Sequence, residues 1–169
     1  MNPLRILPAP LHRLVYRLAH RARGLWYART RQTVHGCSVI AQDESGRILL
    51  VRHSYGPATW TFPGGGIRRH ETPMGAAKRE FGEELQCNLR ETRRVDTLEE
   101  SFFGATNVVH IFTGLVDGQP RPDRREIVEA RFFARDEFPS NLSRWVPARM
   151  AALDAASAER PEGHKLQQR

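Results

Sequence analysis

From Thr33 onward, short apolar runs alternate with turn-forming residues, and this pattern predicts β-strands joined by tight connections. Strands are expected at 34–41, 47–52, 60–62, 92–100, 107–116 and 130–134. Two further segments have their apolar residues at helical spacing, one beginning at Pro73 and one at 144–155. No internal repeat or second domain is indicated, so we expect one domain at 33–155 and a polar, frayed tail at 156–169.

The helix that begins at Pro73 has clear start signals. Thr72 is a favourable N-cap, and proline suits the first helical position because its missing N–H is not needed there. Gly82 lies inside the helix and costs about 1 kcal/mol relative to alanine. We expect packing to hold the helix through an apolar stripe made of Met74, Ala77, Phe81 and Leu85.

Residues 11–27 form a separate pattern, a basic amphipathic helix within an N-terminal segment at 1–32. We expect its apolar face to dock on the domain, on a second copy of the chain as in a homodimer, or over a sheet edge. Binding to an anionic membrane surface is a sharper alternative. Contact with RNA or DNA is a further one, and nucleic acid is the least expected partner.

The charge of the chain is concentrated in that segment. The 169 residues carry a formal charge of +7, yet seven of the 26 basic residues and none of the 19 acidic ones lie within 1–32. The rest of the chain is therefore balanced at 19 of each, which argues against a nucleic-acid surface on the domain.

Composition also narrows the class of protein. Cys37 and Cys87 are the only cysteines and form no C-x-x-C pair, so neither a disulfide framework nor a zinc site is indicated. No apolar run approaches the ~20 residues that span a bilayer, and no signal-peptide pattern is seen. We expect a cytoplasmic protein, with attachment to the inner face of the membrane as the alternative that residues 11–27 leave open.

Three glutamates crowd one face of the helix, since Glu80, Glu83 and Glu84 stand at i, i+3 and i+4. Like charges at this spacing cost roughly 0.2–0.5 kcal/mol per pair. A solvated acidic face is the simple explanation, but the helix follows a glycine-rich turn at 63–66 and a further carboxylate at Glu71. Hard oxygen donors gathered in this way suit Mg²⁺ or Mn²⁺, which make crowding favourable.

The spacing of these residues resembles the Nudix box, G-x5-E-x7-R-E-U-x-E-E-x-G-U, in which U is a bulky aliphatic residue. The box would occupy 65–87, where Phe81 is acceptably bulky and Cys87 fits the last apolar place loosely. Gln86 replaces a glycine, which is a departure from the pattern. The fixed letters that match are Gly65, Glu71, Arg79, Glu80, Glu83 and Glu84.

The resemblance covers roughly residues 33–146 and implies a fold and an activity. Members of the family are α/β proteins, with an α/β/α sandwich around a mixed β-sheet; here an extra N-terminal amphipathic helix is expected. They use a divalent metal to cleave nucleoside diphosphates linked to another moiety. The alternative is a non-catalytic Nudix-fold module that binds a nucleotide or a partner.

The resemblance also implies site residues. The metal ligands would be Glu80, Glu83, Glu84 and the carbonyl oxygen of Gly64. Arg79 would orient a box glutamate, and Glu71 would support the loop by pairing with it. The catalytic set is therefore expected to be Glu80, Glu83, Arg79 and Glu126.

Glu126 is the favoured extra carboxylate, as general base or ligand, because 124–133 resembles the later loop that often supplies one. Glu129 is second, and Asp123, Glu99 and Glu100 stay open. For the substrate, Arg52 is expected to contact phosphate, with Gly65 and Gly66 in the turn.

Two features outside these roles complete the predictions. A left-handed Gln86 would be strained, so we expect the helix to continue to Asn88.

Phe102 and Phe103 stand where ADP-ribose-type relatives tend to have proline, and no tyrosine follows Cys87, unlike dinucleoside-polyphosphate relatives. Both observations argue against those two substrates and leave a nucleotide or nucleotide derivative as the expected substrate.

Overall fold

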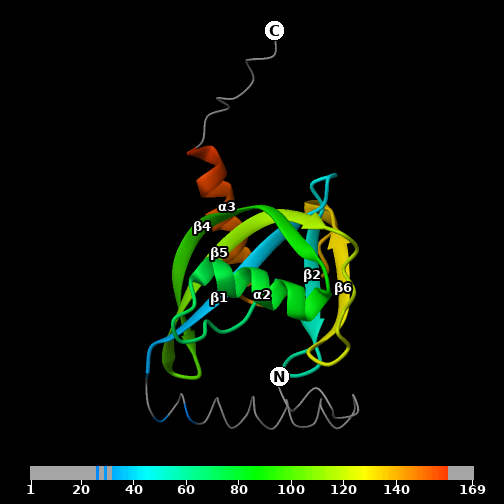
Figure 1. The fold of residues 1–169 in the computed structure, drawn as a ribbon. Helices are drawn as coiled ribbons and strands as arrows, with labels where there is room; N and C mark the ends of the chain where they lie inside the picture. Colours follow the sequence, from blue (N-terminus) through cyan, green and yellow to red (C-terminus); the bar gives the residue numbers. More distant parts are fainter. Residues whose placement is uncertain (1–25, 27–28, 30–31, 160–169) are drawn as a thin grey trace.

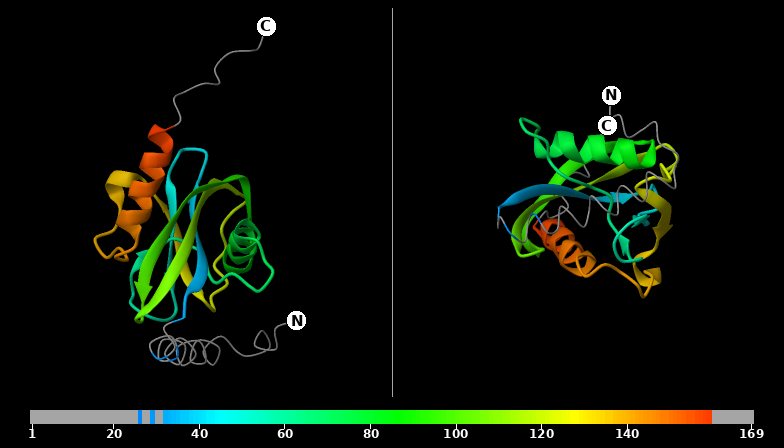
Figure 2. Two further views of the ribbon diagram at one scale, coloured as in Figure 1. Left: turned by 90° about the vertical axis from the view of Figure 1, so that its left-hand side faces the viewer. Right: turned by 90° about the horizontal axis from the view of Figure 1, so that it is seen from below.

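The protein folds around a mixed β-sheet with one helix on each face (Figures 1 and 2). The structure is a computed structural model that describes Trp26, Arg29 and residues 32–159. Apart from Trp26, the segment predicted as a helix at 11–27 lies outside the described residues, as does the tail beyond 159. Within the part that is described, no helix is long and apolar enough to cross a bilayer.

The sheet contains six strands, which the sequence pattern places correctly in kind and order. They pair in the order β3-β2-β1-β5-β4, and β6 joins the sheet beside β2. Among the strand pairs of the described residues, β1–β5 is parallel and the others are antiparallel. The strands are β1 (Val34–Gln42), β2 (Ile48–His53), β3 (Trp60–Thr61), β4 (Asn88–Phe102), β5 (Ala105–Asp117) and β6 (Ile127–Phe133).

Two helices complete the α/β/α sandwich. Helix α2 (Pro73–Leu85) covers one face of the sheet and α3 (Val146–Ala158) covers the other, as Figure 2 shows with the sheet seen between them. A short 3-10 helix, η2 (Arg135–Glu137), precedes α3. The predicted α/β/α fold class is confirmed, and α3 runs three residues beyond the expected end at 155.

Each face of the sheet has its own core because strand side chains alternate between the two faces. The α2 side is built around Val39, Leu49, Phe81, Leu85 and Phe112. The α3 side is built around Ile40, Leu50, Trp60, Ile111 and Leu153. This alternation decides which polar residues lie near the α2 glutamates.

Helix α2 begins as predicted. The Thr72 hydroxyl accepts the N–H of Gly75 at 3.1 Å, and Pro73 occupies the first helical position. The helix therefore starts on local signals that the sequence shows directly.

The predicted continuation of α2 to Asn88 is wrong. Gln86 takes the left-handed conformation itself, with φ 55°, and its N–H donates to the carbonyl oxygen of Gly82 at 3.0 Å. The carbonyl oxygens of Leu85 and Glu84 accept the N–H groups of Arg121 and Asp123 at 2.7 and 3.0 Å. The helix stops because the loop before β6 takes these carbonyls and β4 already begins at Asn88.

Candidate active site

The glycine-rich turn is fixed against the edge of β1. Val39 N–H donates to the carbonyl oxygen of Pro63 at 2.9 Å, and Cys37 N–H donates to that of Gly65 at 2.8 Å. Gly64 has φ +148°, and a β-carbon there would stand 2.2 Å from the carbonyl oxygen of Cys37. Only glycine allows the turn to lie this close to the strand, so the sheet positions the turn rigidly below α2.

Gly65 leaves room for a carboxylate. A β-carbon built on Gly65 would fall 2.6 Å from the carboxyl carbon of Glu80. The absence of a side chain at this position is what lets the Glu80 carboxylate rest on the turn. The carbonyl oxygens of Gly65 and Gly66 are used within the protein, by Cys37 and by Arg79. The prediction that these two glycines contact substrate stays untested.

Glu84 is the deepest charged group of the site. It is 3% exposed, and its Oε2 accepts the N–H of Gly64 at 3.2 Å. Burial raises its pKa well above 4.5, and the nearby carboxylates of Glu80, Glu126 and Asp123 raise it further. The single hydrogen bond from Gly64 acts in the opposite direction and is outweighed.

Glu80 lies in the same buried region. Burial raises its pKa, while the ion pair with Arg79, at 2.8 Å, acts against this increase. Burial thus raises the pKa of both Glu80 and Glu84, and the Glu80 carboxylate is close enough to raise that of Glu84 further. Such a pair costs free energy unless a cation neutralises it.

Arg79 ties the loop to the helix. Its guanidinium group makes two parallel contacts with Glu71, at 2.7 and 2.8 Å, and donates to the carbonyl oxygen of Gly66 at 3.1 Å. The third nitrogen pairs with Glu80. These contacts lower the pKa of Glu71 to about 2 and raise the pKa of Arg79. The geometry agrees with the role expected of Arg79, which is to orient a box glutamate.

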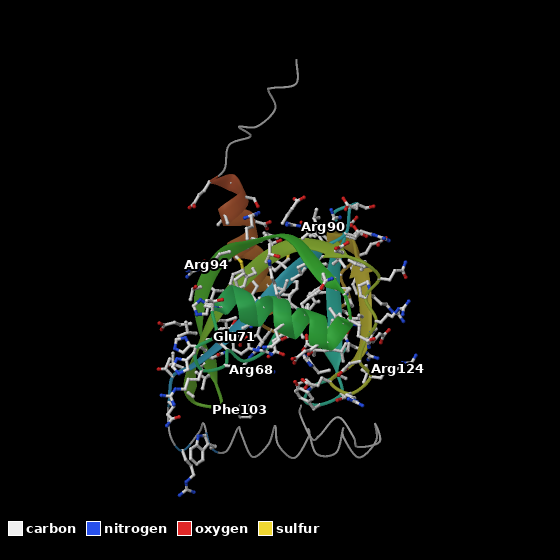
Figure 3. The ribbon with its side chains drawn as sticks, in the orientation of Figure 1. Arg68, Glu71, Arg90, Arg94, Phe103 and Arg124 are labelled. Atoms are coloured by element: carbon white, nitrogen blue, oxygen red, sulfur yellow. The ribbon has the colours of Figure 1, made fainter. Side chains whose placement is uncertain are left out.

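Glu83 differs from its two neighbours. Its side chain is 41% exposed, and its carboxylate lies 3.4 Å from Arg68 and 3.6 Å from Arg79. Figure 3 shows Arg68 beside Glu71 at one end of α2, with Arg124 on the loop at the other end. The three glutamates therefore share one helix face but their carboxylates do not meet at one point, and the role of Glu83 as a ligand stays a prediction.

The loop before β6 brings Glu126 to the site. An oxygen of Asp123 accepts the N–H groups of Arg125, Glu126 and Ile127 at 2.9–3.0 Å, which folds the loop into a compact turn. Glu126 is close enough to Glu84 to raise its pKa. Asp123 therefore organises the loop, and no local pattern in the sequence distinguished this role from that of a general base.

The other candidate acids lie elsewhere. Glu129 and Arg52 pair with each other at 2.6 Å on neighbouring strands. The Arg52 guanidinium stands 5.5 Å from the ring of Trp60, which belongs to the α3-side core. The sheet thus separates Arg52 from the α2 glutamates, and its role in phosphate binding stays untested. Glu99 is exposed on β4.

Glu100 is part of a buried group that the sequence did not reveal. It pairs with Arg149 of α3 at 3.0 Å, and Arg149 also donates to the Ser38 hydroxyl at 3.0 Å. Arg149 is separated along the chain from Glu100 by 49 positions and from Ser38 by 111, so no local sequence pattern indicates these contacts. This group joins α3 to β1 and β4.

A groove opens on the outer side of α2 beside Glu83. Its volume is about 610 Å³, and it lies between the helix and the loop before β6. The residues that line it are Lys78, Arg79, Gly82, Glu83, Gln86, Asp123 and Arg125. Lys78, Gly82 and Arg125 had no assigned role in the sequence pattern.

The donors at this site fit a divalent cation. Across the described residues, no three His, Cys, Asp or Glu side chains are gathered closely enough to form a complete metal cage. The buried carboxylate of Glu84 and the partly buried carboxylate of Glu80 nevertheless offer hard oxygen ligands near the glycine-rich turn. Hard cations such as Mg²⁺ keep several waters and need few protein ligands.

Comparison with known proteins agrees with this geometry. The family model described as the NUDIX domain matches residues 33–155. The chain belongs to the Nudix family. A MutT Nudix hydrolase from Burkholderia pseudomallei has a similar structure, with 26% identity and a TM-score of 0.63, over 73% of this chain and 97% of that one. The present Nudix protein is a hydrolase, and enzymes of this family generally use divalent metal ions.

Two curated relatives add detail to the family assignment. An isopentenyl-diphosphate Delta-isomerase from Streptomyces griseus is 30% identical over 160 residues, which cover 82% of this chain and 73% of the relative. An RNA pyrophosphohydrolase from Saccharophagus degradans is 43% identical over 47 residues. That second match spans 28% of each chain. A MutT protein from Methanosarcina mazei Go1, at 16% identity and a TM-score of 0.67 over 76% of this chain and 97% of that one, shows the shared fold alone.

Proposed function

We propose that this Nudix hydrolase is a pyrophosphohydrolase that needs Mg²⁺ or Mn²⁺ and cleaves a nucleoside diphosphate linked to another moiety. The observation that carries the proposal is the buried carboxylate of Glu84, whose pKa is raised by burial and by three neighbouring acids. Burying crowded carboxylates lowers the stability of a folded protein, and a bound cation would offset this cost.

The roles of the residues follow from their positions. Glu80 and Glu84, with the carbonyl oxygen of Gly64, would hold the ion, and Glu83 would complete the set by turning inward. When bound, the ion would neutralise charge on the phosphate oxygens and make water more acidic. Arg79 holds the Glu80 carboxylate in place and links it to the turn through Glu71 and Gly66.

Glu126 is the proposed general base. Its position near Glu84 supports this assignment, because it brings a further carboxylate to the place where the ion and its water would lie. In this role the Glu126 carboxylate accepts a proton from the attacking water.

A panel of substrates tests the proposal. Nucleoside di- and triphosphates, oxidised dGTP, ADP-ribose, dinucleoside polyphosphates, nucleotide sugars and a 5′-triphosphorylated RNA would be incubated with Mg²⁺ or Mn²⁺, and release of phosphate or of a phosphorylated product would be measured. Glu84→Gln is the blank. Hydrolysis that disappears in the variant is expected. Tight metal-dependent nucleotide binding without turnover would favour the non-catalytic module instead.

The similarity to an isopentenyl-diphosphate Delta-isomerase supports a second candidate function. An enzyme of that kind would act on the hydrocarbon part of a diphosphate ester and leave the diphosphate intact. Isopentenyl diphosphate therefore belongs in the same panel, with product identity followed by NMR. Isomerisation without phosphate release would replace the first proposal.

We keep the N-terminal segment as a separate proposal, together with the cytoplasmic location expected from the sequence. If residues 11–27 contact a membrane or a second copy of the chain, deletion of residues 1–32 will reduce sedimentation with anionic vesicles or convert a dimer to a monomer. Unchanged vesicle binding, RNA binding and oligomeric state after the deletion would end this idea.

A further inference from the structure

The backbone on both sides of Glu126 is fully hydrogen-bonded. Two peptide groups meet at its α-carbon, and each offers one N–H and one carbonyl oxygen. Asp123 Oδ1 accepts the N–H groups of Glu126 and Ile127, at 3.0 and 2.9 Å. Ser54 binds the two carbonyl oxygens: its hydroxyl donates to that of Arg125 at 2.5 Å, and its N–H donates to that of Glu126 at 2.8 Å. Rotating either peptide would break two of these hydrogen bonds, so they fix the direction in which the Glu126 side chain leaves the backbone.

The same loop is tied to the C-terminal end of α2 (Figure 1). The N–H of Asp123 donates to the carbonyl oxygen of Glu84 at 3.0 Å. Asp123 therefore contacts the backbone of a proposed metal ligand with its N–H and the backbone of Glu126 with its carboxylate. This places Glu126 relative to α2 from one side, while Ser54 places it relative to β2 from the other.

Ser54 acts where the pairing of β2 with β6 becomes irregular. The register shifts between Arg52 and His53, and His53 pairs with Ile127 at the start of β6. An irregularity of this kind disrupts the ladder locally and redirects side chains. Ser54 follows directly and is buried. Its hydroxyl adds a contact that strand pairing alone does not provide, because a strand residue has a single backbone N–H.

We infer that Ser54 is a positioning residue for hydrolysis, which acts through Glu126 by holding the peptide groups on both sides of it. The inference rests on the proposed function, in which the Glu126 carboxylate accepts a proton from the attacking water. A general base works only within hydrogen-bond reach of the proton that it takes, so a small displacement of its backbone slows the reaction. In this role Ser54 contacts neither the substrate nor the metal ion.

Ser54→Ala removes the hydroxyl and keeps the backbone N–H. The assay uses dGTP with Mg²⁺, or the substrate of the panel above that is hydrolysed fastest. We expect kcat to fall about tenfold or more and KM to stay within about twofold, because the base is displaced while the binding of substrate is not altered. Ser54→Cys has a thiol of similar size that donates more weakly, so its kcat should be intermediate. The cysteine variant also replaces the alanine variant if the latter does not fold.

A double-mutant cycle shows whether Ser54 acts through Glu126. Glu126→Gln removes the proposed base, so there is no longer a carboxylate for Ser54 to position. In this background, Ser54→Ala should lower kcat by less than about twofold. A serine with a purely structural role would cause the same loss of kcat in both backgrounds.

Thr113→Val is the matched control. The hydroxyl of Thr113 is buried in the sheet and donates to the carbonyl oxygen of Ile40 at 2.8 Å. Like Ser54→Ala, this variant loses one buried hydrogen bond to a backbone carbonyl group. We expect the melting temperatures of the two variants to fall by similar amounts, while kcat falls in Ser54→Ala and stays within about twofold of the wild type in Thr113→Val.

Three kinetic results would overturn the inference. They are an unchanged kcat in Ser54→Ala, an equal loss of kcat in Thr113→Val, and an equal loss in the Glu126→Gln background.

Hydrogen exchange adds a measurement that does not need turnover. In Ser54→Ala, the amides of Glu126 and Ile127 should exchange about tenfold faster or more, while those of α2 stay protected. Unchanged exchange at these two amides would reject the inference even in an active enzyme. A wild-type protein that hydrolyses nothing on the panel would instead reject the proposed function, and the role of Ser54 in hydrolysis with it.

Discussion

At the scale of single residues, the carboxylate of Glu84 is the charged group whose ionised form the fold disfavours most clearly. Its carboxylate is buried and stands near three other acids, and its pKa in the folded protein is raised well above 4.5. A carboxyl group with a raised folded pKa takes up a proton on folding. Its ionisation therefore opposes folding, and this opposition grows as the pH rises above about 4.5.

Glu84→Gln should remove this penalty. In metal-free buffer at pH 7–8, we expect the variant to melt at the same temperature as the wild type or higher, with the difference vanishing near pH 4. Turnover in Mg²⁺ should fall about a hundredfold or more, because the proposed ligand of the ion is lost. Thermal melts across this pH range and kinetics on one substrate check both parts. A large loss of metal-free stability would contradict the electrostatic interpretation.

Glu71 shows the opposite behaviour. Hydrogen bonds from Arg79 lower its pKa to about 2, so its contribution to stability is present above pH 4.5 and is lost as the pH falls toward 2. We expect Glu71→Gln to lower the free energy of unfolding at pH 7 by about 1.5–3 kcal/mol. The difference from wild type should shrink between pH 4.5 and 2 in denaturant titrations.

Glu44→Gln is the control for this variant. Glu44 pairs with Arg90, but its side chain is 73% exposed. A surface pair of this kind contributes about 0–1 kcal/mol. Similar losses in the two variants would show that the Arg79–Glu71 pair has no special role.

At the scale of elements, the two ends of α2 have different causes. Its start is determined by neighbouring residues, the N-cap Thr72 and the first helical residue Pro73. Its end depends on distant residues, because the loop before β6 caps the carbonyl oxygens of Glu84 and Leu85. The sequence could therefore predict where the helix begins, but the strain expected at Gln86 was a poor guide to where it ends.

Gln86→Gly tests how much strain the helix end retains. A residue other than glycine in the left-handed conformation costs roughly 1–2 kcal/mol. Glycine removes this strain, but it also raises the entropy of the unfolded chain, which offsets part of the gain. We expect the variant to be more stable by about 0.5–1 kcal/mol in chemical denaturation. Ala151→Gly, at an exposed position inside α3, should instead lose about 1 kcal/mol. Destabilisation by Gln86→Gly would show that the glutamine side chain has a role of its own.

At the scale of the whole molecule, the sheet determines which acidic side chains lie on the same face as α2. Strand alternation and two register shifts in β4, between Arg90 and Arg93 and between Arg94 and Asp96, set the face on which each later β4 residue lies. The sequence narrowed the extra carboxylate to a few candidates. It favoured Glu126 but could not exclude Glu100, because the face on which Glu100 lies depends on pairing between distant strands.

The positions of the box residues, in contrast, depend on local spacing along the chain. Their spacing along one helix and one adjacent turn is local, so the set of Arg79, Glu80 and Glu84 near Gly64 could be predicted from the sequence. The outward direction of Glu83 and the buried contact of Arg149 depend on packing, and only the structure reveals them.

The Arg149–Glu100 pair should be a major tertiary contact between α3 and the sheet. Removing one partner of a buried pair leaves the other charge without compensation and costs about 3–5 kcal/mol. We expect Arg149→Met to lose this amount in denaturant titrations, with metal affinity unchanged in the fraction that remains folded. The double variant with Glu100→Leu should recover much of the stability. No recovery would mean that packing, not charge, explains the loss.

The central claim is that the buried carboxylates of α2 form a divalent-cation site. Calorimetric titration of Mn²⁺ into the wild type and into Glu84→Gln tests it most directly, with Glu44→Gln as the control. We expect saturable binding to the wild type and to the control, and an affinity at least about tenfold lower for Glu84→Gln. Equal affinity in all three proteins, or no binding to the wild type, would contradict the claim.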